Sequence, residues 1–75
     1  MNLLQMSVNE PLVVDGINSS DKVLKERMRS LGIVPDSSIL IKRFGLFKST
    51  VMVAIGGTWV GLRKTEAQII DVHSF

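Results

Sequence analysis

The side chains that most often carry out catalysis are scarce in this sequence. His73 is the only histidine, it lies close to the last residue, and there is no cysteine. No recognisable motif places a serine nucleophile beside His73, so we read this histidine as part of a frayed tail. With one histidine and only scattered carboxylates, the sequence predicts no catalytic residue, no metal site and no bound cofactor.

Gly56-Gly57 is a glycine pair that could be mistaken for a phosphate-binding element. A phosphate-cradling loop also needs a lysine followed by serine or threonine, which is missing beside this pair. The pair is typical of a tight hairpin turn, and it predicts no nucleotide site.

The chemistry that the sequence does offer is that of protein binding. Five basic residues lie on strand ends and on the loop they flank, and they would either be simply solvated or contact an acidic partner surface. Such a contact would mainly raise the association rate and would weaken with salt. The basic residues are Lys42, Arg43, Lys48, Arg63 and Lys64.

Large apolar residues complete the candidate binding set. The loop from Phe44 to Ser49 holds more apolar residues than a surface loop requires, so we expect one Phe to plug the barrel end and the other to be an insertion anchor. The candidate partner-binding residues are Lys42, Arg43, Phe47, Met52, Trp59, Arg63 and Lys64.

A hairpin positions several of these residues. Thr50 to Ile55 and Thr58 to Arg63 alternate like strands on either side of the glycine pair. Because side chains in a strand alternate with period two, the apolar residues of this hairpin share one face. The expected pairs are Ile55 with Thr58, Val53 with Val60 and Val51 with Leu62.

The opposite face of the hairpin carries Met52, Ala54 and Trp59. If the aliphatic face fills the core, Met52 and Trp59 must point outward, where they would form a patch for a partner or for self-association. In the alternative reading, the helix or the N-terminal lead covers them as a second small core.

One helix is expected from about Asp21 to Leu31. Leu24, Met28 and Leu31 repeat with helical spacing, and Val23 should widen this buried stripe. Ser19 or Ser20 would cap the start. At the other end, Gly32 and Ile33 predict a Schellman cap, and Pro35 prevents any continuation.

The remaining elements are short. Leu12 to Asp15, closed by Gly16, reads as the first strand, Ser38 to Phe44 as the second and Ile69 to Val72 as the last, with a polar turn over 64–68. About five strands with one helix between the first and second can wrap into a small barrel. We therefore expect a mainly β fold and a single domain over residues 1–75.

Composition limits the other possibilities. The chain has 75 residues, 45% of them hydrophobic and 21% charged, which is apolar enough for a globular fold. No stretch reaches the length of a membrane-spanning helix, and the start lacks the features of a signal peptide. We expect a cytoplasmic protein without direct membrane insertion. A formal charge of +2 is small for a nucleic-acid binder, so no nucleic acid is expected as a partner.

The order of these elements resembles the FeoA family over nearly the whole chain. The resemblance is carried by the helix end RMRSLGIVP, residues 27–35, and by GTWVGLRKTEAQIIDV, residues 57–72. It implies an SH3-like barrel that acts as a non-enzymatic adaptor, binding and modulating the ferrous-iron transporter and GTPase FeoB. Two alternatives stay open: a small barrel that binds single-stranded nucleic acid, and a metal-responsive domain like the C-terminal domain of DtxR-type repressors.

The sequence departs from the family pattern at three places. Asp36 stands where the family usually has glycine, although aspartate tolerates the backbone angles of a turn. Lys48, Ser49 and Thr50 replace a frequent Gly-Asp-Pro. The outer face of the hairpin, where relatives tend to be polar, holds Met52, Ala54 and Trp59.

Overall fold

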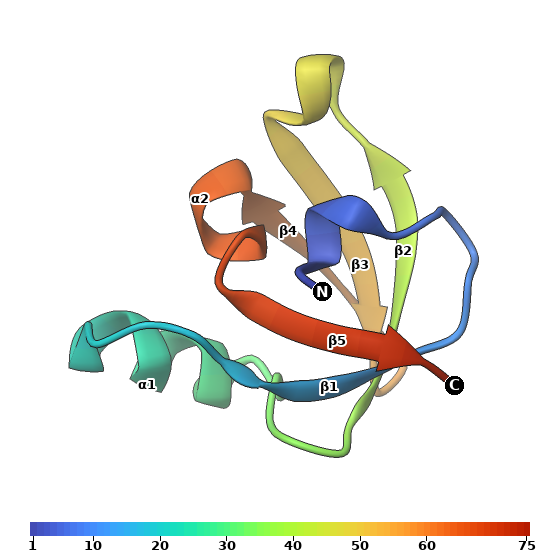
Figure 1. The fold of residues 1–75 in the computed structure, drawn as a ribbon. Coiled ribbons are helices and arrows are strands. Elements are labelled where there is room, and N and C mark those ends of the chain that lie inside the picture. Colours follow the sequence, from blue (N-terminus) through green and yellow to red (C-terminus); the bar gives the residue numbers. More distant parts are fainter.

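A computed structural model describes residues 1–75, whose strands form one five-stranded antiparallel sheet in the order β4-β3-β2-β1-β5 (Figure 1). The strands are β1 (Leu12–Ile17), β2 (Ser38–Phe44), β3 (Thr50–Ile55), β4 (Thr58–Arg63) and β5 (Ile70–Ser74). The helices are α1 (Lys22–Ser30) and α2 (Lys64–Ala67), with two 3-10 turns, η1 (Leu3–Gln5) and η2 (Leu46–Lys48).

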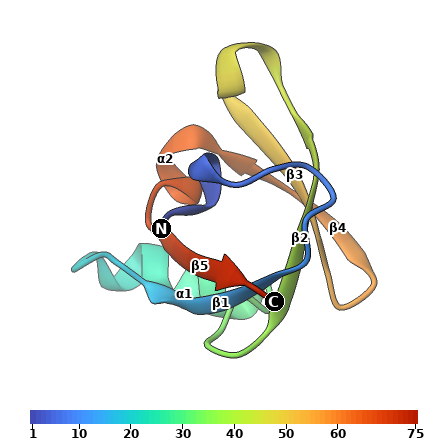
Figure 2. The same ribbon diagram turned by 45° about the vertical axis from the view of Figure 1, so that its right-hand side comes forward.

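The sheet curls into a small barrel, as the two ribbon views show (Figure 2), and it encloses one apolar core. Every strand contributes buried residues to this core, and so do α1, α2 and the N-terminal segment. The predicted mainly β fold with a helix between the first two strands is therefore confirmed. None of the helices is long and apolar enough to cross a membrane.

The β3–β4 hairpin has the predicted register. Val53 pairs with Val60 and Val51 with Leu62, and the apolar face of β3 is buried throughout. Gly56 and Gly57 both have positive φ, 54° and 82°, as the two central residues of a type I′ turn require. The two-residue glycine turn thus sets which side chains enter the core.

Helix α1 ends as predicted and begins differently. The N–H of Ile33 donates to the carbonyl of Met28 at 3.0 Å, and Gly32 has a φ of 88°, which is the Schellman geometry. At the start, the side chain of Asp21 accepts from the first-turn amides, so Asp21 is the N-cap instead of Ser19 or Ser20. A carboxylate also suits the positive end of the helix dipole.

The buried stripe of α1 is narrower than predicted. Met28 is fully buried and Leu24 is half-buried against the core, but Val23 is 81% exposed. The first turn of α1 projects away from the barrel (Figure 1), so the expectation that Val23 widens the buried stripe is wrong. Only the second half of the helix reaches the core.

Three boundaries also differ from the sequence prediction. Strand β1 continues past Gly16 to Ile17 through an irregularity in its pairing with β5. The last strand runs to Ser74, because His73 pairs with Val13, and the tail is not frayed at this residue. The polar turn after β4 is the short helix α2.

The N-terminal segment seals the open side of β5. Leu3 and Met6 are buried in the core, and Asn2 forms a bridge with Asp71. The N–H of Val72 donates to the carbonyl of Met1 at 2.8 Å. The outer edge of β5 is therefore covered at its centre.

Candidate partner-binding face

A β-bulge in β2 brings two cationic residues to the same side of the sheet. Ile41 pairs with Val53 of β3, but the next paired residue is Arg43, which opposes Met52, so Lys42 is the extra residue of the bulge. A bulge changes the alternation of side chains along its strand. As a result Lys42 and Arg43 both line a pocket on the outer face of the sheet, while Ile41 stays in the core.

This outer pocket has a volume of about 360 Å³. Lys42 Nζ lies 5.4 Å from the centre of the Trp59 ring, a cation–π arrangement, and Trp59 is 63% exposed. The pocket is lined by Asn9, Lys42, Arg43, Met52 and Trp59. We call these five residues the outer pocket.

Neither α1 nor the N-terminal segment covers Trp59. The N-terminal segment reaches the rim of the pocket at Asn9, whose N–H donates to the carbonyl of Ile41 at 2.8 Å. Met52 is half-buried, and its Cε would lie 3.9 Å from a Cβ placed on Gly61 opposite it. The outer face of the hairpin could have been an exposed patch or a second small core. Trp59 is exposed, as the first interpretation predicts.

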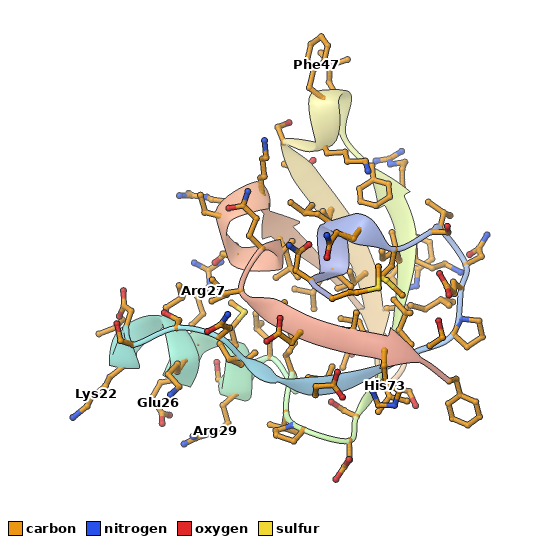
Figure 3. All side chains as sticks on the ribbon, viewed as in Figure 1. Lys22, Glu26, Arg27, Arg29, Phe47 and His73 are labelled. Atoms are coloured by element: carbon orange, nitrogen blue, oxygen red, sulfur yellow. The ribbon has the colours of Figure 1, made fainter.

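The other candidate residues lie toward the opposite end of the hairpin. Arg63 opposes Thr50 and is exposed on the same face of β4 as Trp59. Lys64 begins α2, and its N–H donates to the carbonyl of Ser49 at 3.0 Å. Phe47 is 89% exposed at the tip of the η2 loop, where it points away from the barrel (Figure 3). These residues extend the face but do not line the outer pocket.

The two phenylalanines of this loop differ in burial. Phe44 is half-buried against the core, whereas Phe47 is exposed and has a φ of 54°. Lys48 turns back onto the protein, with its Nζ 4.8 Å from the Phe44 ring centre and 3.2 Å from the carbonyl oxygen of Leu4. Lys48 is exposed, and these two contacts hold its side chain against the loop and the N-terminal segment.

The charges of this protein are segregated by region. The segment 37–65, which contains β2, β3 and β4, carries five lysines and arginines and no aspartate or glutamate. The rest of the chain carries four basic and all seven acidic residues. This segregation is visible in the sequence, but its meaning depends on the fold, which makes the segment one continuous sheet. The resulting face suits an acidic partner.

His73, the one histidine of the sequence, lies beside a single carboxylate. His73 Nδ1 contacts Asp15 Oδ1 between β5 and β1, and both side chains are about half-exposed on the surface. No group of three or more His, Cys, Asp or Glu side chains lies close enough to hold a metal ion together.

Sequence reasoning missed the role of one carboxylate. Glu66 lies in the segment predicted to be a polar turn, and only 4% of it is exposed. Its Oε1 accepts from the N–H of Arg63 at 2.9 Å, and its Oε2 lies 3.2 Å from Arg27 Nη1. The chain of contacts from Arg63 through Glu66 to Arg27 joins the end of β4 to α1.

Comparisons with known proteins agree with this architecture. The FeoA protein from Chlorobium tepidum is 23% identical, with a TM-score of 0.89 over 99% of this chain and 70% of that one. FeoA from Stenotrophomonas maltophilia, complexed with zinc and described as an SH3 domain protein, is 24% identical, with a TM-score of 0.84 over 97% and 89% of the two chains. Both likenesses concern the fold.

A regulatory protein shares the same fold. A manganese-dependent transcriptional repressor in complex with manganese is 28% identical, with a TM-score of 0.91 over all of this chain but only 36% of the repressor. No curated protein matches the sequence. The family model described as the FeoA domain matches residues 1–74. This chain, with its five-stranded SH3-like barrel, therefore belongs to the FeoA family.

Proposed function

We propose that residues 1–75 act as a single adaptor domain in a bacterial ferrous-iron uptake system, without catalysing a reaction. The domain binds the FeoB-type transporter and its GTPase part on the cytoplasmic side. The observation that carries this proposal is the outer pocket, where the bulge at Lys42 places two cations beside an exposed tryptophan. FeoA from S. maltophilia, described as a candidate activating factor for ferrous iron transport, supports the choice of pathway.

The chemistry of the outer pocket fits a protein partner. Trp, Tyr and Arg are enriched among the interface residues that dominate binding energy. Trp59 and Met52 would supply apolar contact, and Lys42 and Arg43 would attract acidic residues of the partner. Arg63, Lys64 and Phe47 would extend the contact along the hairpin and its loop.

Calorimetric titration of the purified domain with the cytoplasmic part of FeoB tests this proposal. Binding should weaken about tenfold or more in Trp59→Ala, since truncation of a central anchor costs at least about 1.4 kcal/mol. Val23→Ala is the control, because Val23 is 81% exposed on the first turn of α1 and does not line the outer pocket. The absence of binding in the GTP-bound, GDP-bound and nucleotide-free states would count against the proposal.

Single-stranded nucleic acid is the second candidate ligand. It is favoured by the Trp59 ring beside Lys42 on strands β2, β3 and β4, which contain no acidic residue, because bases stack on exposed aromatic rings in basic grooves. Trp59 is the single exposed aromatic residue on the strands of that sheet, whereas such sites usually use several. A salt-dependent gel shift with single-stranded DNA or RNA would support this alternative.

A metal-responsive role is the third alternative. The family likeness to the manganese-dependent repressor motivates it, and the chain would then have to bind metal without a ready-made cluster of ligands. A stoichiometric rise of the melting temperature with ferrous ion would favour this role. A role in iron uptake does not itself require the adaptor to bind iron.

A further inference from the structure

Strand β4 leaves part of its outer edge without a backbone partner. In a hairpin with a two-residue turn, the residues that flank the turn form a hydrogen-bonded pair, and such pairs then recur at every second position. Thr58, Val60 and Leu62 therefore bond to β3. The N–H and C=O groups of Trp59 and Gly61 point to the opposite side, where no backbone hydrogen bond engages them.

The opposite edge of the sheet, formed by β5, is covered. The edge of β5 is covered by the N-terminal residues, through the Val72 N–H to Met1 carbonyl bond and the bridge of Asn2 with Asp71. On β4, only the end is covered, where Glu66 accepts from Arg63. Proteins usually protect a free edge with a charged residue or a proline inside the strand, but residues 58–62 contain neither. The free edge of β4 is thus suited to backbone pairing with a strand from another chain.

A groove of about 600 Å³ runs beside this edge. One wall is β4, with Thr58 and Val60, and the other is the end of α1, from Ser30 to Gly32. Ile55 adds an apolar contribution to the lining. The contacts from Arg63 through Glu66 to Arg27 join the same two elements farther along, at the end of β4. A groove between a helix and a free strand edge has the shape that an added β-strand requires.

We propose that an extended acidic segment of the partner protein enters this groove and pairs with β4 as a sixth, antiparallel strand. This inference rests on the proposed adaptor function and names the segment of the partner that the domain binds. In this arrangement the Trp59 and Gly61 backbone groups bond to the added strand. The residues of the added strand that lie opposite Arg63 and Trp59 are on the same outer face as these two side chains, because side chains alternate along a strand.

The charge of the sheet determines the chemistry of the added strand. An acidic residue opposite Arg63 would pair with its guanidinium, and an apolar residue opposite Trp59 would pack on the ring. Since the added strand is antiparallel, the acidic residue comes first and the apolar residue follows four positions later. A second copy of this chain fits less well, because pairing two β4 edges places the basic, acid-free strands β2 to β4 of one copy beside those of the other.

Gly61 allows a matched pair of variants that test the edge. In Gly61→Pro the outward N–H is lost while the bonds to β3 remain, and proline is tolerated at such edge positions. In Gly61→Ala the N–H is kept, and the added Cβ would lie at an ordinary 3.9 Å from Met52 Cε. Calorimetry with the cytoplasmic part of FeoB should show about tenfold weaker binding for Gly61→Pro than for Gly61→Ala.

Amide hydrogen exchange of the unmodified protein gives an independent measurement if Gly61→Pro does not fold. We expect the Trp59 and Gly61 amides to exchange at least about tenfold more slowly in the complex than in the free domain, as amides do on entering a ladder. If the complex forms without slower exchange of these two amides, the proposed added strand is wrong. Equal affinity of Gly61→Pro and Gly61→Ala for FeoB would also refute it. In both cases the proposed adaptor function would remain supported, because the domain still binds FeoB. Failure to bind FeoB at all would contradict both. Slowing that grows with the concentration of the domain alone would identify a second copy as the occupant and refute the acidic segment.

Discussion

The guanidinium of Arg27 and the carboxylate of Glu66 meet between the two helices, with Nη1 3.2 Å from Oε2. Glu66 is almost fully buried, and the other oxygen of its carboxylate is bonded to the N–H of Arg63. Burying a carboxylate is costly unless it is paired and hydrogen-bonded, and both conditions are met here. This contact holds α1 against the barrel, and so keeps the wall of the β4 groove in place.

We expect Arg27→Ala to lower the free energy of unfolding by about 1–2 kcal/mol, because it leaves a buried carboxylate with less compensation while Arg27 itself is partly exposed. Arg29→Ala is the control, since its pair with Glu26 is exposed on both sides. That change should cost less than about 0.5 kcal/mol. Urea denaturation of the two variants measures the difference, and equal losses would show that the Arg27 contact has no special role.

The depth of α1 in the core gives a second prediction. Met28→Ala should destabilise the protein by about 2–4 kcal/mol, because it removes a fully buried side chain and leaves a cavity. Val23→Ala should change stability by less than about 0.5 kcal/mol, since Val23 is exposed and alanine favours the helix. Thermal or urea unfolding can compare the two. A large loss from Val23→Ala would mean that the first turn of α1 is packed.

A third prediction concerns the turn between α1 and β2. Asp36 has a φ of 72°, in a region that costs most residues about 1–2 kcal/mol and costs glycine almost nothing. Asp36→Gly should therefore stabilise the protein by up to about 1 kcal/mol, because the N–H to the Val14 carbonyl bond is kept. Asp36→Ala should be less stable than the unmodified protein. Calorimetry can compare the melting temperatures of the two variants. A higher melting temperature for Asp36→Ala than for Asp36→Gly would contradict this prediction.

The fourth prediction concerns Glu10, which lies beside the end of β5. The Ser74 hydroxyl donates to Oε2 at 2.6 Å and the Ser7 N–H to Oε1 at 3.3 Å, and both lower the pKa of Glu10 below its ordinary value. Because the folded-state pKa is depressed, these bonds stabilise the protein above the unfolded pKa, and the stabilisation is lost as the pH falls through the folded value.

An NMR titration of the Glu10 carboxyl can check this. In Ser74→Ala the pKa should rise toward the ordinary glutamate value, because the larger of the two lowering bonds is gone. Ser20→Ala, a change of an exposed serine elsewhere, should leave it where it is. An unchanged pKa in Ser74→Ala would show that the hydroxyl does not bond to Glu10 in solution.

The features that could be predicted from sequence are those decided by neighbours along the chain. The cap at Gly32 and Ile33 depends on residues within one helical turn. The register of the hairpin depends on a two-residue turn and on a side-chain period of two. For the same reason the outward position of Trp59 followed once Val53 and Val60 were assigned to the core.

The features that were missed depend on contacts between distant parts of the chain. The bulge at Lys42 exists only in the pairing of β2 with β3, so the sequence showed two adjacent cations without showing that they share a face. Burial of Glu66 needs Arg27, which lies in a different helix. The extension of β5 to Ser74 requires β1 as its partner. Local propensity contains no information on any of these three.

The association of this domain with the cytoplasmic part of FeoB, measured for two charge-reversed double variants, tests the importance of the outer pocket most directly. Lys42→Glu/Arg43→Glu changes the pocket, whereas Lys22→Glu/Lys25→Glu makes the same change in net charge on exposed positions of α1. We expect the first variant to lower the association rate about tenfold or more at low salt and the second to change it far less. Equal rates for the two variants would contradict a partner-binding role for this face.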